Sequence, residues 1–371
     1  MKIAYIGIKG LPSKGGAERV VEAIVQRLAK RHVITVYCSR HYTPSNINIQ
    51  GVRLFRVPCL SGKYTHMLSF NLLAALHALI FGRYDLIHLH NIEASFVLPI
   101  LKLRYPVIAT AHGRITHENK WGKIATMIIQ SIEVPFGVLS DAATSVSSMH
   151  SQELSARFHR TISYIPNGVD NDVRIDLEAA RCLLETKGLI EQEYILFVAA
   201  RIIPLKGAHL LLEAFRKIKG NYRLVIVGDL SQSPKYARRL RSLADERTIF
   251  FPFVNSSSKL LGLLKLSHMF VFSSTNEGMS MVLLEVASVG VPILCTDIPA
   301  NTAVLSNRAL YFRLGDVTDL SEKLQWALDH PYDMEKLGQQ ARAWVKKQFS
   351  WDMIAEYYDE IYRKLQRTAL F

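Results

Sequence analysis

Long apolar runs are absent from this sequence: no stretch of 18 or more apolar residues is free of charged or polar breaks. A helix that crosses a membrane needs about 20 consecutive, mostly apolar residues. The first ten residues, MKIAYIGIKG, also lack the basic segment, apolar core and small-residue cleavage site of a secretory signal. These absences predict a cytoplasmic protein without a transmembrane span.

Cysteine is also scarce, with four residues in 371: Cys38, Cys59, Cys182 and Cys295. No two of them have the C-x-x-C spacing of zinc sites and redox motifs, and most lie in apolar, strand-like stretches. A disulfide framework and a zinc site are therefore not expected. We interpret the thiols as reduced and buried.

Acidic residues are scarce in the first half of the chain. Residues 1–168 contain 19 Lys and Arg against 8 Asp and Glu, a net charge of +11, whereas residues 169–371 contain 26 against 24, a net charge of +2. This asymmetry indicates an anionic partner for the N-terminal half, such as phospholipid head groups or a phosphorylated acceptor, or else a solvated basic face. Nucleic acid is not expected, because the basic residues show no interleaved aromatics and no zinc-finger or RNP pattern.

The sequence does contain a regular alternation of short apolar stretches with longer stretches of helical period. A first series has apolar stretches at 2–8, 33–38, 85–90 and 106–112 and helical stretches at 17–31, 68–81 and 94–104. A second series has apolar stretches at 194–200, 222–228, 248–253, 268–274 and 291–296, with helical stretches between them. This alternation predicts an α/β protein with two doubly wound, parallel, Rossmann-like sheets.

The turn-rich segment IPNGVDND, residues 165–172, separates the two series. We therefore expect an N-terminal domain over 1–168 and a C-terminal domain over 169–348. An amphipathic terminal helix should follow over 349–371. Parallel sheets bind ligands beyond the carboxyl ends of their strands, so we expect the functional residues just after strands, in a cleft between the two sheets.

The most informative motif is EGMSMVLLE, residues 277–285, directly after the apolar stretch 268–274. Gly278, Met279 and Ser280 would place free backbone N–H groups of a helix start at the strand end, where a diphosphate binds well. Glu285 lies about 7 Å further along that helix. Its carboxylate suits the vicinal hydroxyls of a ribose, and that of Glu277 suits the hydroxyls of a sugar.

Two cations follow the apolar stretch 194–200, namely Arg201 and Lys206. At a strand end that faces a helix start, they would bind a diphosphate and stabilise it as it departs. In the N-terminal half, Gly15 and Gly16 close the loop after the first strand, where a backbone can approach an anionic ligand. His112 adds a hydrogen-bonding side chain at another strand end.

Metal ligands are less well supported. His88 and His90 share one face of a predicted strand, but no third ligand has a convincing spacing. Asp170 and Asp172 form a D-x-D pair in the segment between the domains. We therefore expect no metal site and no cofactor.

In order and spacing, these motifs resemble family 4 of the retaining glycosyltransferases, which have the GT-B fold. The resemblance rests on GGAE, AHG, IPNGVD, RIIPLKG, VGD, EGMSMVLLE and the terminal FSWDMIAEYYDEIY, and spans nearly the whole chain. It implies that Arg201 and Lys206 bind the donor diphosphate, that Glu285 binds ribose and that Glu277 contacts the transferred sugar. It also implies that His112 lies beside the donor sugar and that the terminal helix crosses back to the N-terminal domain.

The loop GIKGLPSKGG and the segment KWGKIA, residues 120–125, resemble a subgroup that includes rhamnosyltransferases of cell-surface polysaccharide assembly. We therefore expect a nucleotide-sugar donor and a lipid-linked or saccharide acceptor. Without a metal, Arg201, Lys206 and the helix start must neutralise the leaving diphosphate. The sequence shows no pair of carboxylates of the kind that a covalent double displacement would use. We therefore expect the acceptor to attack on the face that the diphosphate leaves. A nucleotide-sugar epimerase or a non-catalytic GT-B binding subunit is the alternative.

The basic N-terminal half also predicts peripheral attachment to the inner face of the cell membrane. Lys120, Trp121 and Lys123 precede the apolar run IATMII, which would lie among anionic head groups with the Trp at the interface. An ordinary core-facing helix with a solvated basic start is the alternative.

Overall fold

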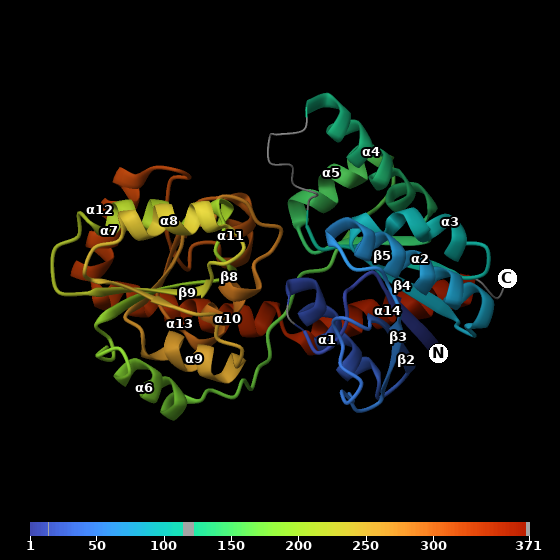
Figure 1. Ribbon diagram of the computed structural model, residues 1–371, viewed down its shortest axis with the longest axis horizontal. Coiled ribbons are helices and arrows are strands. Elements are labelled where there is room, and N and C mark those ends of the chain that lie inside the picture. Colours follow the sequence, from blue (N-terminus) through green and yellow to red (C-terminus); the bar gives the residue numbers. More distant parts are fainter. Residues whose placement is uncertain (14, 114–121, 369–371) are drawn as a thin grey trace. The chain divides into compact units, whose positions relative to one another are not determined.

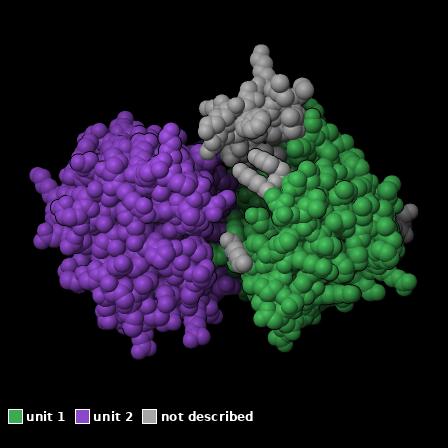
Figure 2. Space-filling model, viewed as in Figure 1, with its two compact units in different colours: residues 1–168, 351–371 green, residues 169–350 purple. Residues whose placement is uncertain are grey.

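The computed structural model describes residues 1–13, 15–113 and 122–368 (Figure 1). It divides the chain into two compact units, and Figure 2 shows each in its own colour. Unit 1 comprises Met1–Gly168 and Trp351–Phe371, and unit 2 comprises Val169–Ser350. The chain passes from unit 1 to unit 2 after Gly168, where the sequence places the domain boundary. It returns to unit 1 after Ser350, two residues later than expected.

Unit 1 is built on a seven-stranded parallel sheet with strand order β3-β2-β1-β4-β5-β6-β7. Its strands are β1 (Lys2–Ile6), β2 (Val33–Ser39), β3 (Val52–Val57), β4 (Leu86–His90), β5 (Val107–Ala111), β6 (Ala142–Ser145) and β7 (Ser163–Tyr164). Its helices are α1 (Gly16–Leu28), α2 (Lys63–Phe81), η1 (Ile92–Val97), α3 (Leu98–Leu101), α4 (Gly122–Leu139), α5 (Ser148–Phe158) and α14 (Trp351–Thr368).

Unit 2 is built on a six-stranded parallel sheet with strand order β10-β9-β8-β11-β12-β13. Its strands are β8 (Tyr194–Arg201), β9 (Arg223–Asp229), β10 (Thr248–Phe251), β11 (Met269–Phe272), β12 (Ile293–Thr296) and β13 (Leu310–Phe312). Its helices are α6 (Leu177–Glu185), η2 (Pro204–Lys206), α7 (Ala208–Phe215), α8 (Pro234–Leu243), α9 (Ser257–Leu266), α10 (Met281–Val289), α11 (Pro299–Leu305), α12 (Val317–Asp329) and α13 (Pro331–Gln348).

Helices cover both faces of each sheet. In unit 2, α7, α8 and α12 lie on one face and α9, α10 and α13 on the other (Figure 1). The central strands are mostly apolar because both of their faces are buried, as the four consecutive buried residues of β11 illustrate. The predicted fold class, two doubly wound parallel sheets of the GT-B type, is confirmed.

The terminal helix α14 packs on α1 within unit 1. Its apolar side is buried through Ile354, Ala355, Tyr358 and Tyr362. This is the predicted return of the chain to the N-terminal domain.

Acidic side chains of α14 contact basic side chains of the N-terminal half. Asp359 is almost completely buried; it forms an ion pair with Arg31 at 3.0 Å and accepts a hydrogen bond from His32 at 2.7 Å. Arg27 donates to Asp352 at 2.7 Å. Part of the basic excess of residues 1–168 is therefore neutralised within the protein, which the charge count alone did not reveal.

The four cysteines do not share one environment. Cys38 and Cys295 are buried in strands, Cys59 is half-buried, and Cys182 is exposed on α6. The interpretation of the thiols as buried is therefore wrong for Cys182, because the helical period of α6 turns that residue outward.

Candidate active site

The strand order of unit 2 creates a switch point between β8 and β11. From β8 the chain continues to β9 on one side, and β11 later pairs with β8 on the other. The loops after β8 and β11 therefore diverge, and the crevice that they leave is the usual ligand site of an open parallel sheet. Arg201 ends β8, and Glu277 lies in the loop after β11.

The loop after β8 packs tightly on the end of β11. Gly207 has φ +69°, and a Cβ atom there would collide with the carbonyl oxygen of Ser273. The Ser273 hydroxyl donates to the Gly207 carbonyl at 3.0 Å, and the Thr275 N–H donates to the Leu205 carbonyl at 2.8 Å. Only glycine combines this positive φ with so close an approach to the Ser273 carbonyl without strain. This packing brings Lys206 to the loop after β11.

Lys206 forms an ion pair with Glu277, 2.6 Å between Nζ and Oε1, with 28% and 12% of the two side chains exposed. The same carboxylate oxygen accepts a hydrogen bond from the Ser274 hydroxyl at 2.7 Å. The sequence suggested both residues for the site but gave no indication that they contact each other. Arg201 is exposed at the strand end.

Helix α10 begins where the sequence predicted. Ser280 is its N-cap and accepts a hydrogen bond from the backbone N–H of Leu283 at 3.4 Å. The first turn contains no acidic residue, so no side-chain charge of its own compensates the positive end of the helix. Gly278 and Met279 lie in the loop before the cap, and Glu285 is half-buried one turn into the helix. The backbone N–H groups at the start of α10 could therefore bind an anion, and this role of the helix start stays a prediction.

In unit 1 the corresponding switch point lies between β1 and β4. Gly15 is the N-cap of α1, and a Cβ atom there would press against the Glu18 carboxylate. Glu18 is buried and accepts a hydrogen bond from the Lys9 N–H at 3.4 Å. Gly15 therefore leaves room for Glu18, whereas Gly16 faces open space on the side where a Cβ would lie.

His112 directly follows β5 and contacts His90 at the end of β4. His90 Nδ1 and His112 Nε2 are 2.8 Å apart, and the two rings stack with centroids 5.1 Å apart. Burial lowers the pKa of His112 to about 4 and the pKa of His90 well below its usual value. Both imidazoles are therefore neutral at neutral pH. His90 was considered only as a metal ligand from the sequence, because its contact with His112 depends on strand order.

Both nitrogens of His88 are engaged in hydrogen bonds. Nδ1 lies 2.6 Å from the Tyr362 hydroxyl on α14, and Nε2 lies 2.7 Å from the Thr110 hydroxyl. His88 therefore connects the terminal helix to the sheet. Among the described residues, no group of three or more His, Cys, Asp or Glu side chains is arranged to hold a metal ion. Metal independence of the reaction stays a prediction.

Two of the three residues expected at the membrane, Lys120 and Trp121, lie outside the described residues. The third, Lys123, falls in the first turn of α4, where only the backbone is described. Within the described parts of the chain, no helix is both long enough and apolar enough to cross a bilayer. Contact of these three residues with a membrane therefore stays a prediction.

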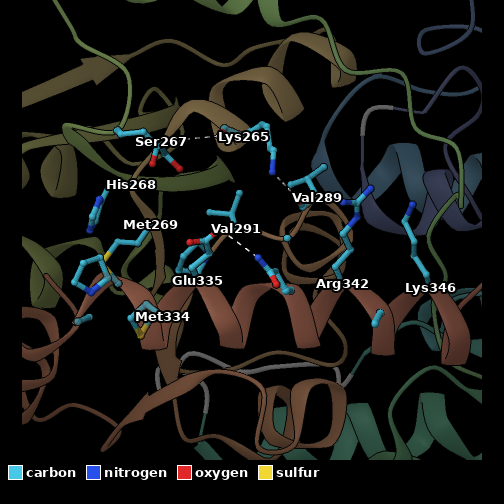
Figure 3. Close-up of a pocket in the computed structure, with 17 residues that line it drawn as sticks. Lys265, Ser267, His268, Met269, Val289, Val291, Met334, Glu335, Arg342 and Lys346 are labelled. Atoms are coloured by element: carbon cyan, nitrogen blue, oxygen red, sulfur yellow. Dashed lines mark hydrogen bonds between the residues drawn. The ribbon is translucent and has the colours of Figure 1, made fainter.

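A separate cavity of about 850 Å³ lies in unit 2 (Figure 3). Its lining includes Gln192, His268 and Pro292, which come just before β8, β11 and β12, together with residues of α13. The cavity is therefore at the amino ends of the strands, opposite the loops that carry Lys206 and Glu277. Parallel sheets bind their ligands at the other end, so we do not assign the donor site to this cavity.

The chain is similar to known proteins along most or nearly all of its length. Spore coat protein SA of Bacillus subtilis strain 168 is 26% identical, over 98% of this chain and 100% of that protein. An Escherichia coli UDP-Gal:α-D-GlcNAc-diphosphoundecaprenol α-1,3-galactosyltransferase is 24% identical, over 83% of this chain and 82% of that protein. Sucrose-phosphate synthase from Thermosynechococcus elongatus has the same fold, with a TM-score of 0.82, 19% identity and 99% of both chains covered.

Two family models match adjoining parts of the sequence. The model of Glycosyltransferase Family 4 matches residues 14–173, and the model of Glycosyl transferases group 1 matches residues 184–344. The two matches correspond closely to units 1 and 2. The chain therefore belongs to the glycosyltransferases that combine a family 4 N-terminal domain with a group 1 C-terminal domain.

Proposed function

We propose that this glycosyltransferase is a retaining, metal-independent enzyme that moves a sugar from a nucleotide-sugar donor to a membrane-associated acceptor, a lipid-linked saccharide or glycolipid, in cell-surface polysaccharide biosynthesis. The observation that carries the proposal is the contact of Lys206 with Glu277 at the switch point of unit 2. A cation that suits a phosphate and a carboxylate that suits sugar hydroxyls are therefore within one hydrogen bond of each other, which supports the proposal. The E. coli relative, named for a UDP-Gal donor and a diphosphoundecaprenol-linked acceptor, supports the substrate classes.

In this proposal the donor diphosphate binds to Arg201, Lys206 and the backbone N–H groups at the start of α10. These groups supply the positive charge that a leaving diphosphate requires. Glu285 binds the ribose, which is consistent with its place one turn into the same helix. The transferred sugar then lies against Glu277.

Glu277 is held by Lys206 and Ser274, so we assign it to binding sugar hydroxyls rather than to nucleophilic attack. The acceptor hydroxyl would attack on the face that the diphosphate leaves, with a diphosphate oxygen taking its proton. That order of events retains the anomeric configuration. His112, neutral because of its lowered pKa, would contact the donor sugar as a hydrogen-bonding group.

We also propose that unit 1 attaches to the inner face of the cell membrane, and the structure suggests α2 as the contact surface. Leu68, Leu72, Ile80 and Phe81 of this helix are 40–71% exposed. No Asp, Glu, Lys or Arg lies between Lys63 and Arg83. An exposed apolar helix face on a basic domain fits the head-group region of an anionic bilayer.

Donor binding is tested first, by measuring which of UDP, GDP, ADP and dTDP raises the melting temperature. Glu285→Ala should weaken binding of that nucleotide by about 1–3 kcal/mol, because a charged hydrogen-bond acceptor is lost. Undiminished binding would remove Glu285 from the site. The anomeric configuration of the product, read by NMR, tests retention; an inverted product would contradict it.

Membrane attachment is tested by sedimentation with anionic and neutral vesicles. Changing Leu68 and Leu72 together to Ser should reduce binding to anionic vesicles, whereas Leu314→Ser, a comparably exposed leucine of unit 2, should not. Changing Lys120 and Lys123 to Glu should weaken binding by at least about 1 kcal/mol for each lysine lost, since each substitution also adds a negative charge. Equal binding to both vesicle types at low salt would contradict the proposal.

A further inference from the structure

The contact between His90 and His112 constrains where the protons of both rings lie. One hydrogen lies between His90 Nδ1 and His112 Nε2, which are 2.8 Å apart. A neutral imidazole has one N–H and one bare nitrogen. Two arrangements are therefore possible, both rings protonated at Nδ1 or both protonated at Nε2.

The surroundings of His90 distinguish the two arrangements. Its Nε2 is buried and has no hydrogen-bond partner among the described residues. The ring is packed against Tyr5 at a centroid distance of 5.6 Å and against His88 at 4.0 Å. If His90 carried its proton on Nε2, a buried N–H donor would have no acceptor, and such orphaned donors are rare in folded proteins. A bare nitrogen packed between these two rings is the better-tolerated alternative.

We propose that His90 is a positioning residue that donates from Nδ1 to Nε2 of His112 and thereby holds His112 as the Nδ1–H tautomer. The acceptor nitrogen of His112 is then occupied, and its remaining ring nitrogen is a hydrogen-bond donor only. His112 is partly exposed, and no described residue forms a hydrogen bond with its Nδ1. Its ligand is therefore an oxygen that accepts a hydrogen bond, such as a sugar hydroxyl or a phosphate oxygen.

This donor role follows from the geometry alone, but the identity of the ligand rests on the proposed function. A fixed tautomer matters because a histidine that alternates between its two tautomers presents an N–H donor to the ligand only part of the time. His90 can hold His112 in this way because β4 and β5 are neighbouring strands, so their carboxyl ends lie side by side.

The proposal is tested by NMR on the full chain labelled with ¹⁵N-histidine, with His112→Gln to assign the His112 signals. The wild-type protein should show a protonated Nδ1 and a bare Nε2 for His112. The opposite pattern would overturn the proposal whether or not the protein is active. If no transferase activity were found with any donor, the proposed function would fail, but the tautomer measurement would still decide this inference.

His90→Leu and His90→Asn are a matched pair, because the two side chains have nearly the same shape and only Asn can donate to His112. In His90→Leu we expect His112 to populate the Nε2–H tautomer and kcat/KM to fall about tenfold, the value of one lost hydrogen bond. In His90→Asn, activity should recover in proportion to the fraction of Nδ1–H tautomer. Equal activities in two variants that melt at the same temperature but differ in tautomer would overturn the positioning role.

Discussion

Lys206→Ala removes a cation that has two partners in the proposed site, and the two effects of its loss can be separated. In the ligand-free protein Lys206 neutralises Glu277. In the proposed donor complex it would contact the diphosphate. Loss of a charged contact to the diphosphate corresponds to about 1.5–3 kcal/mol, or roughly 10- to 100-fold weaker nucleotide binding. Titration calorimetry with the nucleoside diphosphate measures this directly.

The same substitution leaves Glu277, with only 12% of its side chain exposed, without its cation. The Ser274 hydroxyl remains as a donor, so we expect a loss of about 1–3 kcal/mol rather than the larger penalty of a fully buried charge. For a domain the size of unit 2, each kcal/mol corresponds to about 2–4 °C in melting temperature. Thermal unfolding therefore reports the second effect independently of ligand.

Glu277→Gln is the matched control, because it keeps the shape and one acceptor oxygen, replaces the other oxygen by an NH2 group and removes the negative charge. Nucleotide binding should stay equal or become tighter, since the diphosphate no longer approaches a carboxylate, while sugar transfer should fall at least tenfold. The double variant should regain the stability that Lys206→Ala loses but not its nucleotide affinity. Equal weakening of nucleotide binding by both single variants, or by neither, would refute the reasoning.

Three further predictions concern the stability of the protein, its dependence on pH and the independence of sugar transfer from metal ions. Asp359→Asn should destabilise the protein by about 3–5 kcal/mol in urea unfolding, since this buried carboxylate contacts Arg31, His32 and Arg363. Asp352 is mostly exposed, so Asp352→Asn should cost less than about 1 kcal/mol. Similar losses of stability in the two variants would contradict the role of Asp359 as a buried ion-pair partner. Because burial lowers the pKa of His88, His90 and His112, with His112 at about 4, the unfolded chain takes up protons first as pH falls below about 6.5. Stability should therefore decrease from pH 6.5 towards pH 4, by up to about 1.4 kcal/mol per pH unit for each imidazole, and pH-independent urea midpoints would refute this. Sugar transfer should survive excess EDTA. If EDTA abolished activity and Mg²⁺ restored it, a metal ion would neutralise the leaving diphosphate, the role that we assign to Arg201 and Lys206.

The elements of this fold were predictable because each has a local signal. The alternation of apolar and helical stretches predicts both parallel sheets, and Ser280 before an apolar helical stretch marks the start of α10 as an N-cap. The stretch at 94–104 was less well predicted: it is a short 3-10 helix followed by one turn of α-helix, α3, with Pro99 at its start. A helical period alone does not distinguish these forms.

The contacts within the site were not predictable from one sequence, because they join distant residues. Lys206 and Glu277 are 71 positions apart, and His90 and His112 are 22 apart. Which strands are neighbours decides both contacts. Similarly, the charge count suggested a basic surface, but Arg31 is engaged by α14, more than 320 positions away.

At both switch points a glycine of the loop after the first strand packs against the end of the neighbouring strand. Gly7 after β1 packs against the carbonyl oxygen of His90 at the end of β4, and Gly207 after β8 packs against that of Ser273 just beyond β11, both with positive φ. Each glycine lets a loop approach the neighbouring strand end closely enough for side chains there to meet.

Gly207→Ala should therefore separate Lys206 from Glu277, whereas Gly188→Ala is a control with a similar φ of +60° and no atom near the added Cβ. Both substitutions incur the left-handed backbone cost of about 1–2 kcal/mol. Only Gly207→Ala also forces the loop away from Ser273, so it should lower the melting temperature further and weaken nucleotide binding at least tenfold. If the two variants melted together and bound nucleotide equally, close packing at the switch point would not be what assembles the site.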